Sequence, residues 1–244
     1  MRRPTGGGPM PDDSRMNPAD SCEDPLELDP AALGERERYF LLTSVVVPRP
    51  IAWVSTLDAD GARNLAPYSY FNACSATPPI VHFTSTTSRD SIANVRATGE
   101  FVINIVSEDL AAAMRVSSAA LHGGEDEFEV AGLEAAPSRT VRPPRVARAK
   151  VALECRLRQL LEIGEGTMAF GDVLHVHVER SVWRDGQVDP TLLRPVGRLS
   201  GRHYTTVADV YSLELPADVR RRAGDYSIRG GPAGPDDQAD SIRS

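Results

Sequence analysis

The chain has 244 residues, of which 41% are hydrophobic, and its formal net charge is −7 at pH 7. This length allows one large or two small domains, and this hydrophobic fraction is enough for a sizeable core. The negative charge disfavours nucleic acid and anionic membrane as electrostatic partners.

The cysteines and the N-terminal residues favour a reducing compartment for the protein. Cys22, Cys74 and Cys155 lie far apart and are odd in number, which excludes a CxxC metal site and argues against a disulfide framework. No run approaches the roughly 20 apolar residues of a membrane span, and the first residues do not resemble a secretory signal. We therefore expect a cytoplasmic protein with no membrane partner.

Composition predicts one domain between two tails. Residues 1–25 are rich in Pro, Gly, Asp and Ser, and residues 223–244 are similar. Such segments cannot bury enough apolar surface to offset the entropy of ordering them, so both are predicted to be disordered. The interval 26–222 shows no further break in composition and no internal repeat, which favours a single domain.

The first half of the domain predicts short elements in series. Residues 29–30, Asp-Pro, suit the start of a short helix in which acidic residues follow. Residues 58–61, Asp-Ala-Asp-Gly, predict a turn between two antiparallel strands, and residues 80–84 predict a strand. Ser88 is expected to cap a helix that ends at Gly99.

The second half predicts more strands. A strand over 101–106 is followed by a helix capped by Ser107. Alternation over 151–158 places Cys155 on a buried face and Glu154 on the opposite face. The glycines of 164–166 predict a hairpin turn, and Leu174, Val176 and Val178 form a second alternating strand. Many short strands with few helices favour a barrel or a sandwich.

The usual catalytic motifs are missing from the sequence. It contains no GxSxG, HExxH, GxGxxG or P-loop motif. His175 and His177 would lie on one side of a strand, where two histidines could bind a metal ion. Because no third ligand is nearby, we favour the interpretation that they are surface histidines, and we predict no metal site.

Two segments suit flavin mononucleotide. Residues 64–75 are dense in small residues, so the backbone could approach a flat ligand, and Trp53, Tyr68 and Phe71 could supply an apolar platform. Residues 84–91 combine several hydroxyls, a guanidinium and the start of a helix, which suits a phosphate dianion. Taken alone, the second segment is also compatible with a simple capped turn that carries a surface arginine.

Together these segments resemble the flavin-reductase-like family of FMN-binding split barrels, in particular its flavoredoxin-like members. The resemblance is carried in order by VPRPIAWVST at 47–56, NLAPYS at 64–69, the proline pair at 78–79, RDS at 89–91 and GEFVIN at 99–104. It spans about residues 39–215. It implies a mainly β fold with peripheral helices, namely a homodimeric split β-barrel with FMN in a groove near the subunit interface.

The resemblance also implies the residues that bind the flavin. One wall of the flavin groove would be lined by Arg49, Trp53, Ser55 and Thr56. The flavin ring would be held by Asn64, Ala66, Pro67, Tyr68, Ser69, Cys74 and Ser75. The phosphate would be held by Ser85, Ser88, Arg89, Asp90 and Ser91. Arg89 stands where the family often has Lys, which keeps the positive charge.

Three further residues are interpreted within this resemblance. His203 lies in the segment 197–204, which resembles the one that closes over the flavin, so it is either a nicotinamide or substrate contact or an ordinary surface histidine. Cys74 is expected to be a buried structural thiol, because nothing beside it except loop amides would lower its pKa. Cys155 is expected in the core.

The resemblance implies an NAD(P)H-dependent flavin reductase. In such a protein a hydride passes from the nicotinamide to flavin N5, and alignment matters more than any side-chain acid or base. The electrons would pass to a monooxygenase or another acceptor. Two alternatives stay open: a flavoredoxin-like electron carrier or substrate-specific flavoenzyme without NAD(P)H activity, and a non-enzymatic flavin-binding module.

Overall fold

The structure is a computed structural model that describes residues 25–86, 90–119, 125–213, 215–216 and 219. Apart from Pro25, the two predicted tails lie outside the described residues. Contacts between Cα atoms divide the chain into two units, Met1–Tyr39 and Phe40–Ser244. No helix among the described residues is long and apolar enough to cross a membrane.

The first unit contains the predicted helix start. Asp29 caps the 3₁₀ helix η1 (Pro30–Ala32), and its side chain accepts a hydrogen bond of 2.9 Å from Ala31 N. The acidic residues expected to follow belong to a separate helix, α1 (Glu35–Val45), because Leu33 has an extended backbone that ends η1. The residues of α1 after Tyr39 belong to the second unit.

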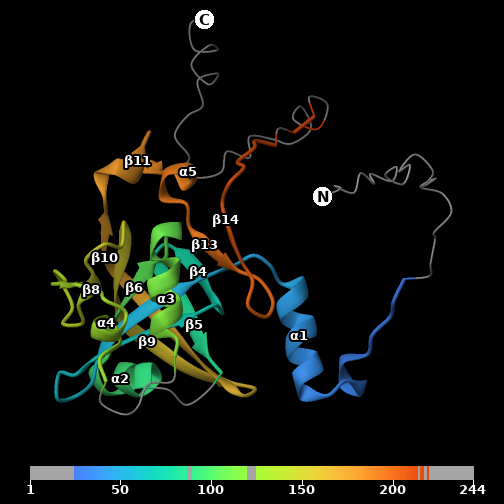
Figure 1. The fold of residues 1–244 in the computed structure, drawn as a ribbon, viewed down its shortest axis with the longest axis horizontal. Helices are drawn as coiled ribbons and strands as arrows, with labels where there is room; N and C mark the ends of the chain where they lie inside the picture. Colours follow the sequence, from blue (N-terminus) through green and yellow to red (C-terminus); the bar gives the residue numbers. More distant parts are fainter. Residues whose placement is uncertain (1–24, 87–89, 120–124, 214, 217–218, 220–244) are drawn as a thin grey trace, which may run out of the picture. The chain divides into compact units, whose positions relative to one another are not determined.

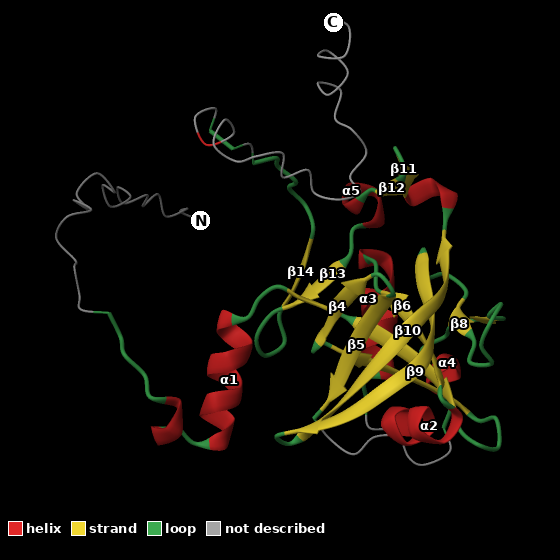
Figure 2. Ribbon diagram, turned by 180° about the vertical axis from the view of Figure 1, so that it is seen from behind, coloured by secondary structure: helices red, strands yellow, loops and turns green. Residues whose placement is uncertain are grey.

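The second unit is built around a seven-stranded antiparallel sheet in the order β3-β2-β6-β9-β10-β5-β4 (Figure 2). The strands are β2 (Ala52–Leu57), β3 (Arg63–Tyr68), β4 (Phe71–Ala76), β5 (Pro79–Ser85), β6 (Glu100–Ile105), β9 (Val151–Ile163) and β10 (Gly166–Val178). The sheet curls so that β3 also contacts β5. In the link from β3 to β4, Tyr70 O accepts a hydrogen bond of 2.8 Å from Thr84 N of β5. The predicted β-barrel is therefore confirmed.

Smaller elements surround the barrel (Figure 1). Three short strands form a second sheet: β1 (Arg49–Pro50), β13 (Val196–Arg198) and β14 (Tyr204–Thr206). Two strand pairs are β7 (Ala135–Ala136) with β8 (Arg145–Val146) and β11 (Trp183–Arg184) with β12 (Gln187–Val188). The helices are α2 (Asp90–Thr98), η2 (Glu108–Leu110), α3 (Ala111–Ser117), α4 (Glu127–Val130), η3 (Arg180–Val182) and α5 (Pro190–Leu193).

Two apolar clusters cover the two faces of β2. Because side chains alternate along a strand, Ala52 and Val54 point into the barrel, where Phe83 and Phe101 pack. Trp53 belongs instead to the other cluster, which includes side chains from α3 and α4. Both helices contact β3. The barrel wall is therefore buried on both sides at β2, which explains its continuous apolar run.

Several predicted local elements are confirmed. Asp58 Oδ1 accepts hydrogen bonds from Asp60 N and Ala62 N in the turn between β2 and β3. The predicted strand at 80–84 lies within β5, and α2 ends before Gly99, whose φ is +72°. The expected capping residue Ser88 lies outside the described residues.

One prediction in the second half holds only in position, and another is wrong. Ser107 is the N-cap residue of η2, but its side chain makes no capping hydrogen bond, and its hydroxyl donates to Asp109 Oδ1 over 2.6 Å. The face of β9 opposite Cys155 is not exposed at Glu154, which is 0% exposed. The segment 138–143 covers that face, and Val141 packs there with Ala152. The burial of Cys155 is confirmed.

Candidate functional site

A buried polar cluster joins α2 to the barrel. Asn64 Nδ2 donates to Ser91 Oγ over 2.8 Å, and Asn94 Nδ2 donates to Thr56 Oγ1 over 3.0 Å. The four side chains come from β2, β3 and α2, and all are buried. Three of the predicted flavin-binding residues, Thr56, Asn64 and Ser91, therefore meet in one network that fixes the first turn of α2 against two strands.

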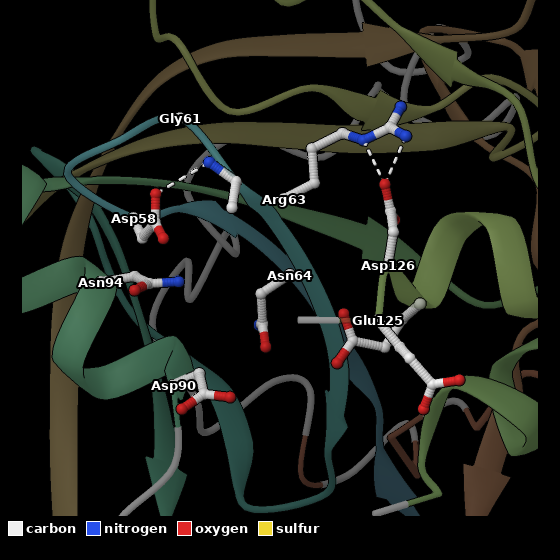
Figure 3. A pocket seen from close by; sticks show the side chains of 10 residues that line it. Asp58, Gly61, Arg63, Asn64, Asp90, Asn94, Glu125 and Asp126 are labelled. Carbon is white, nitrogen blue, oxygen red and sulfur yellow. Dashed lines mark hydrogen bonds and ion pairs between the residues drawn. The ribbon is translucent and has the colours of Figure 1, made fainter. Parts of the chain in front are cut away.

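A pocket of about 490 Å³ lies beside this cluster (Figure 3). Its lining is rich in carboxylates: Asp58, Asp90, Glu125, Asp126 and Glu127 line it with Gly61, Ala62, Arg63, Asn64 and Asn94. Arg63 is the only basic residue among these described residues, and its Nε donates to Asp126 over 2.6 Å. These carboxylates would repel a phosphate dianion. The predicted phosphate contact Arg89 lies outside the described residues.

Glu127 ties this pocket to the barrel. Its Oε2 accepts a hydrogen bond of 3.1 Å from Leu65 N on β3, which lies at one end of the sheet. Burial raises the pKa of the Glu127 carboxyl. The contact satisfies an amide at the sheet edge, and it holds the start of α4 against β3.

A second cavity is an apolar groove of about 560 Å³. Four segments of the second unit meet in it: the end of α1 with the strand β1, the link from β3 to β4, the strand β5, and the β9–β10 hairpin. Its lining residues are Leu42, Val46, Pro48, Arg49, Pro50, Ser69, Tyr70, Phe71, Asn72, His82, Thr84, Thr86, Ile163, Gly164, Glu165, Gly166 and Met168. Its volume is in the range of small-molecule sites.

Arg49 anchors one side of the groove. It is 5% exposed, and its Nη1 donates to Thr43 O and Val46 O over 2.7 and 2.6 Å. Its Nη2 donates to Leu199 O over 2.9 Å. These bonds fix the guanidinium, yet its buried Nε has no hydrogen-bond partner within the described part of the chain.

His82 lines the same groove from β5 and was not predicted from the sequence. Its Nδ1 is buried and, among the residues described, has no hydrogen-bond partner. Burial lowers the pKa of this imidazole, because the charged form is disfavoured away from water. The sequence signal is slight: His82 alternates with the inward-pointing Val81 and Phe83 on β5, which places it on the outer face.

The structure places the predicted flavin-binding residues in different surroundings. Arg49 and Ser69 line the groove, and so does Phe71, one of the expected platform aromatics. Thr56, Asn64, Asp90 and Ser91 lie in the polar cluster or its pocket. Ser85 is buried at the end of β5. In sequence it lies between the groove residue Thr84 and the cluster residue Ser91.

Three of the expected wall and ring residues lie in the packed interior. Trp53 is 0% exposed, and its Nε1 donates to Ser117 Oγ over 2.9 Å. Ser55 donates to Pro144 O. The Tyr68 ring lies 4.9 Å from that of Phe83. None of the three lines either cavity, because β2 and the end of β3 are covered on both faces.

Four more of the predicted residues lie on the two edge strands of the sheet, β3 and β4. Ala66 and Pro67 are half-buried on β3, and Ser75 is half-buried on β4. Cys74 is exposed on the edge strand β4, so its expected burial is wrong, and partial desolvation raises the pKa of its thiol. His203 is exposed. Ser88 and Arg89 lie outside the described residues.

His177 is not a plain surface histidine. Its Nε2 lies 2.5 Å from Glu154 Oε1, and its ring centroid is 4.8 Å from that of His175. Sequence alternation missed this pair because it placed Glu154 in solvent. Within the described residues no group of three or more His, Cys, Asp or Glu side chains could hold a metal ion.

Comparisons with known proteins agree with this architecture. The model of the flavin reductase like domain matches residues 44–192. An uncharacterised protein of Halalkalibacterium halodurans is 35% identical over 208 residues, which cover 81% of this chain and all of that protein.

Two solved structures are similar over most of their length. Nitrilotriacetate monooxygenase component B from Bacillus cereus is 30% identical, with a TM-score of 0.75 over 78% of this chain and 100% of that one. The 2-nitrobenzoate 2-nitroreductase NbaA of Pseudomonas fluorescens is also 30% identical, with a TM-score of 0.74 over 79% of this chain and 97% of that one. The chain therefore belongs to the flavin reductase-like family of split β-barrels.

Proposed function

We propose that this protein is an FMN-binding oxidoreductase that acts as an NAD(P)H-dependent flavin reductase. The observation that carries the proposal is the groove at Arg49, whose walls are mostly apolar and whose buried polar atoms are few. Sites for planar cofactors combine such walls with a small number of placed polar groups. Membership of the flavin reductase-like family makes a flavin the first candidate.

The groove fits the ring of a flavin in chemical terms. Tyr70, Phe71 and Met168 offer apolar surface, and Arg49 Nε–H offers a donor that no described residue uses. A buried donor without a partner is costly unless a ligand accepts its hydrogen bond. Arg49 would bind a ring carbonyl, and Ser69 and Phe71 would contact the ring.

The phosphate is proposed to lie at residues 85–91. Thr84 and Thr86 line the groove, and the chain then continues to Asp90, the first residue of α2. Ser85 ends β5 and Ser91 lies in the first turn of α2, and the predicted phosphate contacts Ser88 and Arg89 lie between them in sequence. The polar cluster around Asn64 would position α2 rather than contact the ring.

The chain's own contribution is alignment and the exclusion of water. Bound FMN would accept a hydride at N5 from NADH or NADPH and pass electrons on. The hydrogen bonds from Arg49 to Thr43 O and Leu199 O fix the groove wall, so little reorganisation is needed on binding. A contact between His203 and nicotinamide stays a prediction.

The partners are also part of this proposal. Component B of nitrilotriacetate monooxygenase is among the similar proteins, which favours a monooxygenase as electron acceptor. A homodimer is supported by Leu174 and Val176, which are 38% and 46% exposed where β10 extends beyond its pairing with β5. A cytoplasmic location agrees with the sequence.

A second candidate function is a substrate-specific flavoenzyme or electron carrier. The nitroreductase NbaA is as similar to this chain as the monooxygenase component, and it shows that the same fold also serves another reaction. The two candidates differ in whether a pyridine nucleotide reduces the bound flavin.

An anaerobic visible spectrum tests the proposal. We expect added FMN to bind and its absorption to bleach rapidly with NADH or NADPH. Bleaching only by dithionite would favour the second candidate. Binding of flavin with no turnover by any reductant would indicate a non-enzymatic binding module, and failure to bind any flavin would contradict the proposal.

Arg89→Ala tests the phosphate site. We expect this variant to weaken binding of FMN about tenfold or more and to leave binding of riboflavin almost unchanged, because riboflavin lacks the phosphate. Arg96→Ala is the matched control, since Arg96 lies on α2 and pairs with exposed Glu162. Equal losses for both flavins in Arg89→Ala would show that this segment does not bind the phosphate.

A further inference from the structure

The strand register holds His82 at a defined place in the groove. On β5 it pairs with Asn72 of β4 on one side and with Phe170 of β10 on the other. The imidazole centroid lies 5.9 Å from that of the Phe170 ring, at a tilt of 42°. The paired strands on both sides therefore restrict where this side chain can lie.

Two buried polar atoms without partners belong to residues that line this one groove, namely Arg49 Nε and His82 Nδ1. Most buried polar atoms in folded proteins have a hydrogen-bond partner, so two such exceptions in one cavity indicate a ligand. The other charged residue of the groove lining is Glu165, in the exposed β9–β10 turn.

We infer that His82 is a ligand-orienting residue that accepts a hydrogen bond at Nδ1 from a ring N–H of the bound planar molecule. The inference rests on the proposed function. Arg49 Nε–H can only donate, so it requires a carbonyl, whereas an imidazole nitrogen can accept. Together the two atoms require a ligand that offers both a carbonyl and an N–H. The pyrimidine edge of a flavin has this pattern, with N3–H between two carbonyls.

The test compares FMN with its N3-methyl derivative. We expect the wild-type protein to bind N3-methyl-FMN about tenfold more weakly than FMN, because the methyl group removes the donor. His82→Phe keeps an aromatic ring beside Phe170 and removes both nitrogens. It should bind FMN about tenfold more weakly than wild type and should not distinguish FMN from the methylated form.

Two further variants make the test specific. His82→Asn places a side-chain oxygen near the position of Nδ1 and should recover part of the discrimination between the two flavins. His175→Phe is the matched control, because His175 is a half-buried histidine on β10 that does not line the groove. It should behave as wild type, and near-ultraviolet circular dichroism would check that each variant is folded.

The outcomes separate the two proposals. Equal affinity of wild type and His82→Phe for FMN, or an equal loss on N3-methylation in both, would overturn the role of His82 and leave the proposed function intact. Failure of the wild-type protein to bind any flavin would overturn the proposed function and this inference with it.

Discussion

Glu154 and His82 are both polar side chains on barrel strands, and their surroundings are opposite. The Glu154 carboxylate is 0% exposed and accepts from Arg139 N, Thr140 N and Thr140 Oγ1 over 2.6, 2.5 and 2.5 Å. It also contacts His177. The buried Nδ1 of His82 has no hydrogen-bond partner in the part of the chain that the structure describes.

This difference separates a polar group that serves the fold from one that serves a ligand. Glu154 has exchanged water for several donors, and the bonds fasten the segment 138–143 to β9. His82 has lost water at Nδ1 and gained nothing in the protein itself, so its free-energy cost is offset only when something binds in the groove.

The largest expected effect is that of Glu154→Gln. The substitution puts an amide N–H₂ against donors that need an acceptor, so the free energy of unfolding should fall by about 3 kcal/mol. Urea denaturation would measure the loss. Glu162→Gln, at the exposed end of the same strand, is the control and should change the free energy of unfolding far less, because its ion pair with Arg96 lies in solvent. Similar small losses in both variants would show that the Glu154 network does not stabilise the fold.

Acid should remove the same stabilisation. Although burial opposes it, the hydrogen bonds from Thr140, Arg139 and His177 lower the pKa of Glu154 from 4.5 to about 2. Because the folded-state pKa is the lower one, the contribution is complete above pH 4.5 and is lost as the pH falls toward 2. A shift of this size corresponds to about 3 kcal/mol.

The free energy of unfolding measured between pH 6 and pH 2.5 tests this. The difference in unfolding free energy between wild type and Glu154→Gln should narrow as the pH falls below 4.5, because the Glu154 carboxyl of the unfolded wild-type chain then takes up a proton that the folded chain does not bind until about pH 2. A gap that stays constant over this range would mean that the carboxylate charge is not what the network stabilises.

Thr140→Val should have a smaller effect, because it removes one donor of the network and leaves the others. We expect a loss of about 1 kcal/mol in the free energy of unfolding. In the background of Glu154→Gln the same substitution should cost less, and a double-mutant cycle would measure the coupling. Full additivity would contradict a direct bond between the two side chains.

The smallest expected effect on stability is that of His82→Phe. Since Nδ1 has no partner to lose, the free energy of unfolding should stay the same or rise by up to about 1 kcal/mol, even though flavin binding weakens. Thermal unfolding without flavin would measure it. A loss above about 1 kcal/mol would make His82 a structural residue like Glu154.

Local and linear patterns were sufficient for much of the fold. The turn at 58–61, the helix that ends before Gly99 and the burial of Cys155 depend on residues close in sequence, and all three are confirmed. The ordered series of short motifs also pointed to the right family. These features depend on backbone preferences and on the alternation of a strand, which a sequence displays directly.

What surrounds each strand was decided only by the tertiary structure. Alternation placed Glu154 in solvent, but a segment that precedes it in the chain covers that face of β9. Trp53 was expected beside a ligand and lies instead in a cluster with side chains from α3 and α4, and Cys74 was expected inside and lies on an edge strand.

The groove is likewise a product of the tertiary structure. It exists because three separate parts of the sequence meet there: the α1–β1 region, β5 and the β9–β10 hairpin. Alternation indicates which side of its strand a residue faces, but not whether that side meets water, another element or a cavity. That is why the sequence by itself determined the barrel and its family, and only the folded chain brought Arg49 and His82 together.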